Sequence, residues 1–183
     1  MTMTAIVLKI FKTFYHWIKS VMVIILVSLE TLVYLLRNGK VLLIYKKRGL
    51  GAGLYNGVGG KVEKGEEIEE AAIRECIEEI GVRPKVMEWM GVLEFHNNNE
   101  LYGFVHVFIS KDFEGEPRET DEAEPIWFHI NEIPYDKMWE DDKYWLPLVL
   151  SGKKIYGRFW FINDWERMVK YEVYVLHEQR LGK

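Results

Sequence analysis

The sequence of 183 residues contains a single cysteine, Cys76, and only five prolines. One cysteine excludes an internal disulfide and a zinc site built from cysteines, and it favours a reducing, cytoplasmic setting. The 24 basic and 28 acidic residues leave a formal charge of −4, which argues against a protein that coats a nucleic acid polymer through bulk positive charge. The apolar run over residues 22–29 is shorter than the roughly 20 residues that cross a bilayer, and extending it to residue 36 would bury Glu30.

Hydrophobic residues make up 49% of the chain and aromatic residues 14%, which is ample for a packed core and excludes general disorder. The length suits one compact domain with an appendage. We therefore expect an N-terminal extension over residues 1–29 and one domain over residues 30–183. The oligomeric state stays open.

Residues 5–22 form a basic amphipathic pattern, with Lys9, Lys12 and Lys19 on one arc of a helical wheel and large apolar residues on the other. This pattern is typical of a helix that makes weak contact with an anionic membrane surface. Three alternatives remain: the helix packs on its own domain, it packs on a second copy, or it is a poorly ordered leader. Met22 could itself be a start site.

The rest of the chain predicts several strands and two helices. Two apolar runs flank the turn at Asn38 and Gly39 and predict a hairpin. The segment 66–80 has helical periodicity and ends at Gly81, and the segment 141–150 predicts a second helix that Pro147 interrupts. The strands are expected over 31–36, 40–45, 86–95, 101–110, 126–130, 156–161 and 168–176. This mixture indicates an α+β fold.

Three glutamates recur along the first predicted helix. Glu75, Glu78 and Glu79 occupy positions i, i+3 and i+4, so their carboxylates share a face, and Arg74 stands where it can brace them. The opposite face, expected to be buried, carries Ile73, Cys76, Ile77 and Ile80. The carboxylates suit Mg²⁺, with Mn²⁺ as the alternative ion. A solvated acidic surface is the other interpretation, but the preceding Gly59-Gly60 turn can bring a backbone carbonyl to the same metal and let a polyphosphate approach.

These residues together resemble the Nudix box. The matching positions are Gly60, Glu66, Arg74, Glu75, Glu78, Glu79, Gly81 and Val82. The resemblance implies an α/β/α sandwich with a mixed β-sheet, and hydrolysis of a nucleoside diphosphate linked to another group. It further implies that a divalent ion is held by the Gly59 carbonyl and by Glu75, Glu78 and Glu79. The general base stays open among these three carboxylates and Glu122, which matches an acidic residue at the family's metal site.

The resemblance extends from Thr31 to about Leu176 and is closest to the MutT-like diphosphatases of oxidised purine nucleoside triphosphates. It rests on residues 46–53, 56–60 and 138–145. It implies that a substrate such as 8-oxo-dGTP is cleaved to the monophosphate and pyrophosphate, which sanitises the nucleotide pool. The implied substrate-binding residues are Thr31, Lys46, Asn56, Gly60, Phe95, Trp139, Asp141 and Asp142. Departures from that pattern at Leu50, Leu93 and Glu140 leave the preferred base open.

The residue types support a purine site. Trp139 offers an aromatic face, Asn56 offers both a donor and an acceptor, and the adjacent Asp141 and Asp142 would share a proton because like charges raise one pKa. In the alternative interpretation, the aspartates only cap a helix and Trp139 lies in the core. Two functional alternatives remain as well: a Nudix hydrolase of another nucleotide, and a non-catalytic nucleotide-binding module. The complete carboxylate set argues against the latter.

Overall fold

The computed structural model of the protein describes residues 27–177. The amphipathic helix predicted over 5–22 lies outside them, so the predicted boundary between extension and domain stays a prediction. No helix within the described residues combines the length and the apolar character needed to cross a membrane.

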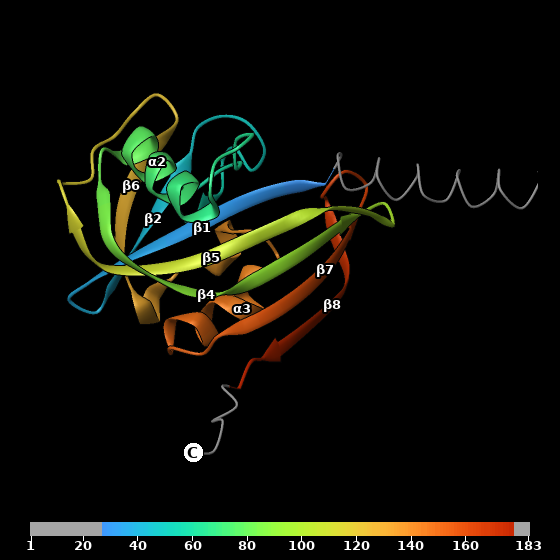
Figure 1. The fold of residues 1–183 in the computed structure, drawn as a ribbon. Coiled ribbons are helices and arrows are strands. Elements are labelled where there is room, and N and C mark those ends of the chain that lie inside the picture. The colour runs from blue at the N-terminus through green and yellow to red at the C-terminus, as the bar shows by residue number, and fades with distance from the viewer. Residues whose placement is uncertain (1–26, 178–183) are drawn as a thin grey trace, which may run out of the picture.

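One mixed sheet organises the described chain (Figure 1). Its strands lie in the order β3-β2-β1-β5-β4-β7-β8, and β6 pairs with β2 on a separate branch. The pairs β1–β5 and β4–β7 are parallel, and the remaining pairs are antiparallel. The strands are β1 (Ser28–Arg37), β2 (Lys40–Lys46), β3 (Tyr55–Asn56), β4 (Arg83–Asn97), β5 (Glu100–Glu114), β6 (Ala123–His129), β7 (Ile155–Ile162) and β8 (Arg167–Val175).

The predicted hairpin is confirmed. Arg37 pairs with Lys40, so only Asn38 and Gly39 form the turn. Both have positive φ, 53° and 73°, which is the backbone of a type I′ turn and explains the Asn-Gly sequence. All the strands predicted along the chain are present, and β4 and β5 extend beyond their predicted ends.

The sheet has an apolar cluster on each side. On one side α2 (Ile68–Ile80) packs on Val33, Leu35 and their neighbours, and on the other α3 (Asp142–Leu150) packs on Tyr34, Leu43 and theirs. Alternation along β1 explains the division, because successive side chains point to opposite faces. Figure 1 shows α2 and α3 on opposite sides of the sheet, as the predicted sandwich requires.

The predicted interruption at Pro147 is wrong. Pro147 lies inside α3, which continues to Leu150. A proline there removes the bond to the carbonyl of Lys143, and both residues are exposed, so water can satisfy that carbonyl. The cost of the proline is therefore small enough for the helix to continue.

The glycine-rich segment before α2 is fixed along β1. The amide N–H of Val33 donates to the Val58 carbonyl at 2.7 Å, that of Thr31 to the Gly60 carbonyl at 2.9 Å, and that of Val62 to the Leu29 carbonyl at 2.8 Å. The loop thus runs antiparallel to β1, which places it between the sheet and the start of α2.

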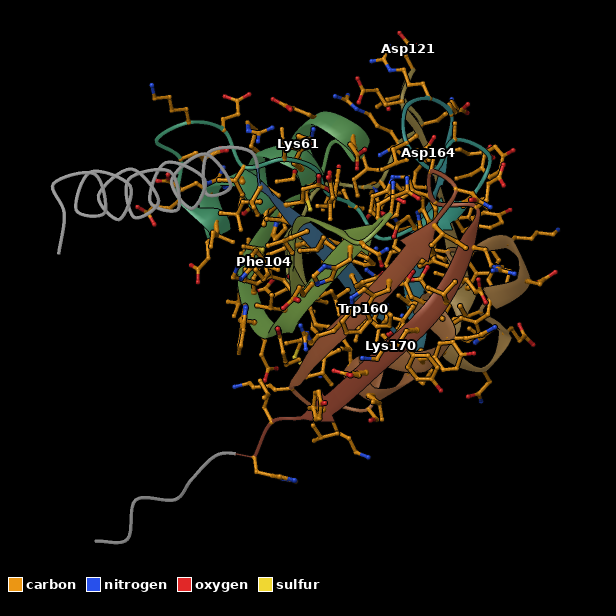
Figure 2. The ribbon with its side chains drawn as sticks, turned by 90° about the vertical axis from the view of Figure 1, so that its right-hand side faces the viewer. Lys61, Phe104, Asp121, Trp160, Asp164 and Lys170 are labelled. Carbon is orange, nitrogen blue, oxygen red and sulfur yellow. The ribbon has the colours of Figure 1, made fainter. Side chains whose placement is uncertain are left out.

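The outer surface of β7 and β8 lies on the side of the sheet opposite to α3. Figure 2 shows Trp160 and Lys170 on this surface and Asp164 in the turn that joins the two strands. Their neighbours on the inner face, Phe159 and Phe161, are buried in the α3 cluster. The α3 side is therefore where strands from both ends of the sheet can enclose a site.

Candidate active site

Glu75, Glu78 and Glu79 do not lie on one exposed face of α2. Glu79 is only 4% exposed and belongs to the buried side of the helix together with Cys76 and Ile80. Ile77, which the periodicity placed on the buried face, is 40% exposed, so that prediction is wrong. The helix is therefore rotated about its axis relative to the prediction, and Glu79 instead of Ile77 is directed towards the loop beside β1.

Glu79 is held by the glycine-rich loop. The Gly59 amide donates to Glu79 Oε2 at 3.0 Å. Burial raises the pKa of Glu79 to about 7, although this hydrogen bond and the charge of Lys46 oppose the rise. The Thr120 hydroxyl donates to the Glu79 carbonyl at 2.8 Å and fixes this end of the helix.

Arg74 connects the loop to the other two carboxylates. Its Nη1 donates to Glu75 Oε1 at 2.8 Å and to Glu78 Oε2 at 3.1 Å. Its Nε and Nη2 reach the two oxygens of Glu66 at 2.9 and 3.0 Å, and Nη2 also donates to the Lys61 carbonyl at 2.9 Å. Arg74 thus braces the acidic cluster from one side. Burial raises the pKa of Glu75 in spite of this ion pair.

Gly59 and Gly60 allow close contacts that no other residue could make. A Cβ at Gly60 would lie 2.6 Å from the Glu75 carboxyl, and a Cβ at Gly59 would lie 2.0 Å from the Thr31 carbonyl oxygen. The bare backbone of the loop therefore touches the carboxylate side of α2 on one side and β1 on the other.

A divalent cation fits the chemistry of this cluster. Within residues 27–177, no three His, Cys, Asp or Glu side chains are arranged so that together they could hold a metal ion. Arg74 explains this arrangement, because it pairs with both Glu75 and Glu78. The donors next to the loop are nonetheless oxygens, the ligands that hard cations such as Mg²⁺ prefer. Because the loop carries no side chain at Gly60, its backbone approaches the Glu75 carboxyl closely.

Glu122 lies close enough to this cluster for its charge to raise the pKa of both Glu75 and Glu79, although burial is the larger cause for each. Its carboxylate also pairs with the Arg48 guanidinium. The structure therefore places Glu122, from the loop before β6, near Glu75 and Glu79.

A cavity of about 340 Å³ opens beside the same loop. All eight of the predicted substrate-binding residues line it: Thr31, Lys46, Asn56, Gly60, Phe95, Trp139, Asp141 and Asp142. They come from β1, β2, β3, the loop, β4 and the segment that begins α3. The Thr31 hydroxyl is buried without a hydrogen-bond partner among the described residues, so it is available to a ligand.

Asp141 and Asp142 are both 2% exposed. Asp141 Oδ2 accepts from the Trp145 indole at 2.9 Å, and Asp142 Oδ2 accepts from the Trp139 amide at 3.1 Å. Burial raises the pKa of Asp141 to about 6, and burial together with the Asp141 charge raises that of Asp142 well above its ordinary value. The pair therefore retains a proton near neutral pH and can donate as well as accept.

The simpler interpretations of these residues are not supported. Asp141 stands at the N-cap of α3 but makes no side-chain cap bond. Trp139 is half-buried and lines the cavity, with its ring edge-on to Phe161 and Trp165 at 6.3 Å from each. Asn56 is partly engaged, because its Oδ1 accepts from the Gly57 amide at 2.8 Å.

Several lining residues were not among the predicted substrate-binding residues, and some of them reach the cavity only through a long-range strand pairing. Phe161 reaches the cavity because β7 pairs in parallel with β4, and Trp165 follows it in the β7–β8 turn with φ of 77°. Glu30 and Tyr102 meet because β1 pairs with β5. The lining residues outside the predicted substrate-binding set are Glu30, Leu32, Leu50, Gly59, Lys61, Leu93, Tyr102, Val105, Trp145, Phe161 and Trp165. Of these, Gly59 was predicted for the metal site, and Leu50 and Leu93 were named as departures from the family pattern.

Comparison with known proteins identifies the fold and its relatives. A NUDIX domain model matches residues 28–149. The chain is 48% identical over 136 residues to an oxidized purine nucleoside triphosphate hydrolase of Danio rerio, and this match covers 73% of this chain and 86% of the relative. The mouse protein of the same name is 43% identical over 147 residues, covering 79% and 93%. The crystal structure of a MutT protein from Bacillus halodurans superposes with a TM-score of 0.70 at 25% identity, over 80% of this chain and 97% of that one.

Proposed function

Because this chain belongs to the NUDIX family, we propose that it is a Mg²⁺-dependent hydrolase of oxidised purine nucleoside triphosphates, which it cleaves to the monophosphate and pyrophosphate. The Danio rerio and mouse relatives carry the name of that activity. The observation that supports it best is the joining of two features by one loop. Gly59 and Gly60 line the cavity of Trp139, Asp141 and Asp142, and they also touch the acidic side of α2.

We assign the cation to Glu75, Glu78, Glu79 and the Gly59 carbonyl. A bound divalent ion supplies a more acidic water and neutralises charge on the phosphoryl oxygens. The chain itself supplies position. Arg74 holds Glu75 and Glu78 in a fixed relation to the loop, and the Gly59 amide holds Glu79. Glu122 adds a fourth carboxylate within reach of the same cluster, and any of the four could take the proton of the attacking water.

The cavity is assigned to the base. Trp139 provides an aromatic surface for a flat purine, and the amide of Asn56 provides hydrogen bonds at the base edge. Because Asp141 and Asp142 share a proton, they can match a base edge that presents either a donor or an acceptor. Oxidation at the 8-position changes that pattern of donors and acceptors, which is why we favour oxidised purines over ordinary ones.

The compartment we propose is the reducing cytoplasm, because Cys76 is buried without a disulfide and its burial raises the thiol pKa. A free nucleotide is the proposed partner. A nucleic acid polymer does not suit a chain with a net charge of −4.

A comparison of turnover on four different nucleotide substrates tests the proposal. The purified protein is assayed with 8-oxo-dGTP, dGTP, a dinucleoside polyphosphate and a nucleotide sugar, with Mg²⁺, with Mn²⁺ and with chelator, and the products are resolved. We expect kcat/KM to be highest on 8-oxo-dGTP, with pyrophosphate released. Equal efficiency on dGTP would refute the sanitising role. Preference for one of the other two substrates would instead identify a different NUDIX hydrolase, and binding without turnover would identify a non-catalytic module.

A further inference from the structure

Glu30 and Tyr102 form a polar pair at the end of the cavity away from the aspartates. Both line the cavity. The Tyr102 hydroxyl donates to Glu30 Oε1 at 3.0 Å, and the Ser28 hydroxyl donates to the same oxygen at 2.6 Å. Burial, with a smaller effect of Glu30, raises the pKa of Tyr102 to about 12, so its hydroxyl keeps its proton and remains a donor.

The position of Glu30 along β1 gives its depth in the cavity. Glu30, Leu32 and Tyr34 alternate along the strand and therefore face the same side of the sheet. Tyr34 lies at the aspartate end, where it packs against Trp145 with ring centroids 5.9 Å apart. Tyr34 lies four residue steps along the strand from Glu30, a distance of about 13 Å at 3.3 Å per residue. A purine bound at the aspartates, followed by its pentose, spans that length.

The strand pairing of Glu30 across the sheet places it near the proposed phosphate site. Glu30 pairs with Lys61 in an antiparallel bridge, and hydrogen bonds on either side of the bridge join Thr31 to Gly60 and Leu29 to Val62. Gly60 in turn abuts the Glu75 carboxyl. Glu30 therefore lies between the base cavity and the acidic cluster, which is where the sugar of a nucleotide must be if the base and phosphates bind as proposed.

As a hydrogen-bond acceptor, the Glu30 carboxylate suits the pentose hydroxyls of a nucleotide better than its triphosphate. An ionised carboxylate only accepts hydrogen bonds. The triphosphate of a nucleotide offers no donor near neutral pH and would repel the carboxylate, whereas the hydroxyls of the pentose are donors. Ser28 and Tyr102 both use Oε1, and no described side chain donates to Oε2.

We propose that Glu30, positioned by Tyr102, is a specificity-determining residue that accepts a hydrogen bond from a pentose hydroxyl of the substrate. The inference rests on the proposed function for the placement of base and phosphates. Oε2 makes the bond to the sugar, and Tyr102 acts only by holding Oε1. Thr31 and Lys46 line the same cavity and were predicted from the sequence, whereas Glu30 is found only through the strand pairing.

The test compares sugars on a constant base. Binding of 8-oxo-GMP, 8-oxo-dGMP and the 2′,3′-dideoxy monophosphate is measured by calorimetry for the wild type, Glu30→Gln and Tyr102→Phe. Binding is used because it needs no turnover, so a protein that hydrolyses no triphosphate still gives a result here. A failure of the proposed activity is therefore separate from a failure of this inference.

We expect Glu30→Gln to weaken binding of at least one hydroxylated sugar by about tenfold, the usual loss for a hydrogen bond to a charged group, and to leave the dideoxy nucleotide unchanged. A loss confined to 8-oxo-GMP assigns the 2′-hydroxyl, and a loss shared with 8-oxo-dGMP assigns the 3′-hydroxyl. Tyr102→Phe should give the same pattern with a smaller loss.

Comparing the sugars controls for general damage, because a distorted cavity would weaken all three nucleotides alike. Glu88→Gln, at an exposed position of β4, is the matched control and should bind as the wild type does. Equal losses for all three nucleotides, or no loss for any, would overturn the proposal.

Discussion

Asp141 and Asp142 are expected to reduce the stability of the folded protein. Burial raises the pKa of Asp141 from its ordinary 3.8 to about 6. Between these two pH values the folded state binds more protons than the unfolded state, so stability falls as pH rises through this window. Above pH 6 the loss due to Asp141 is complete. Asp142, whose pKa is raised further by burial and by the Asp141 charge, extends the loss to higher pH.

The substitution Asp141→Asn removes this cost. An asparagine has nearly the same shape, and its amide oxygen can still accept the Trp145 indole N–H that Asp141 Oδ2 accepts at 2.9 Å. Because the pKa of Asp141 is raised, the gain from the substitution is larger at pH 8, on the order of a few kcal/mol, than at pH 4. Since 1 kcal/mol shifts the Tm of a domain this large by about 2–4 °C, the gain at pH 8 is easily measured.

Urea unfolding of the wild type and Asp141→Asn at several values between pH 4 and pH 8 measures the difference. Asp136→Asn, in the same stretch of chain but exposed, is the matched control and should change the free energy of unfolding by less than about 0.5 kcal/mol at every pH. A difference that does not grow with pH, or an Asp141→Asn protein less stable than the wild type at pH 8, would refute the assignment of a buried, costly carboxyl.

The same substitution should lower activity while it raises stability. Asparagine cannot exchange a proton with Asp142, so kcat/KM on 8-oxo-dGTP should fall by about tenfold, the value of one hydrogen bond to a charged group. A gain in stability with a loss of activity is the signature of residues retained for function. Unchanged activity would make the pair a structural feature of α3 alone.

Gly60→Ala places a Cβ 2.6 Å from the Glu75 carboxyl, so kcat should fall at least tenfold while the circular dichroism spectrum stays unchanged. Gly65→Ala is the control, because Gly65 has open space around it. With its φ of 86°, this substitution should cost about 1 kcal/mol of stability and leave kcat intact. The opposite ranking of the two variants in the kcat assay would contradict the proposed close approach. Glu78→Gln should lower turnover at least 100-fold at saturating Mg²⁺. The control Glu69→Gln, on the first turn of α2, should leave turnover unchanged. Unchanged turnover in Glu78→Gln would argue against the proposed role of Glu78 at the metal. Chelation should abolish turnover and Mg²⁺ should restore it, with far-UV circular dichroism as the check that the fold survives; activity in chelator would exclude the metal.

Local signals in the sequence predicted the elements well. The Asn38-Gly39 turn is specified by two adjacent residues with positive φ, and Gly81 ends α2 with φ of 72°. Such features depend only on neighbouring residues, so the sequence carries them directly. The family resemblance added the residues of the cavity, and the structure brings all eight of them to it.

Long-range pairing was the part that the sequence did not predict. Phe161 and Trp165 lie more than sixty residues from Phe95, and nothing in their local pattern indicates that β7 pairs in parallel with β4. In the sequence, Glu30 served only as a charged residue that argues against a membrane-spanning segment over residues 22–36. Only its bridge to Lys61 and its bond to Tyr102 place it in the cavity.

The rotation of α2 is the most instructive difference. Helical periodicity places Ile77 on the buried face, because an apolar residue gains more from burial than a carboxylate does. The structure instead buries Glu79 and exposes Ile77. Burial of a carboxylate is costly unless it is paired, and among the described residues the compensation is one bond from the Gly59 amide to Oε2 and the charge of Lys46. That imbalance raises the pKa of Glu79 to about 7. A cation at this loop would remove much of the cost, so the orientation of the helix is itself physical support for the metal assignment.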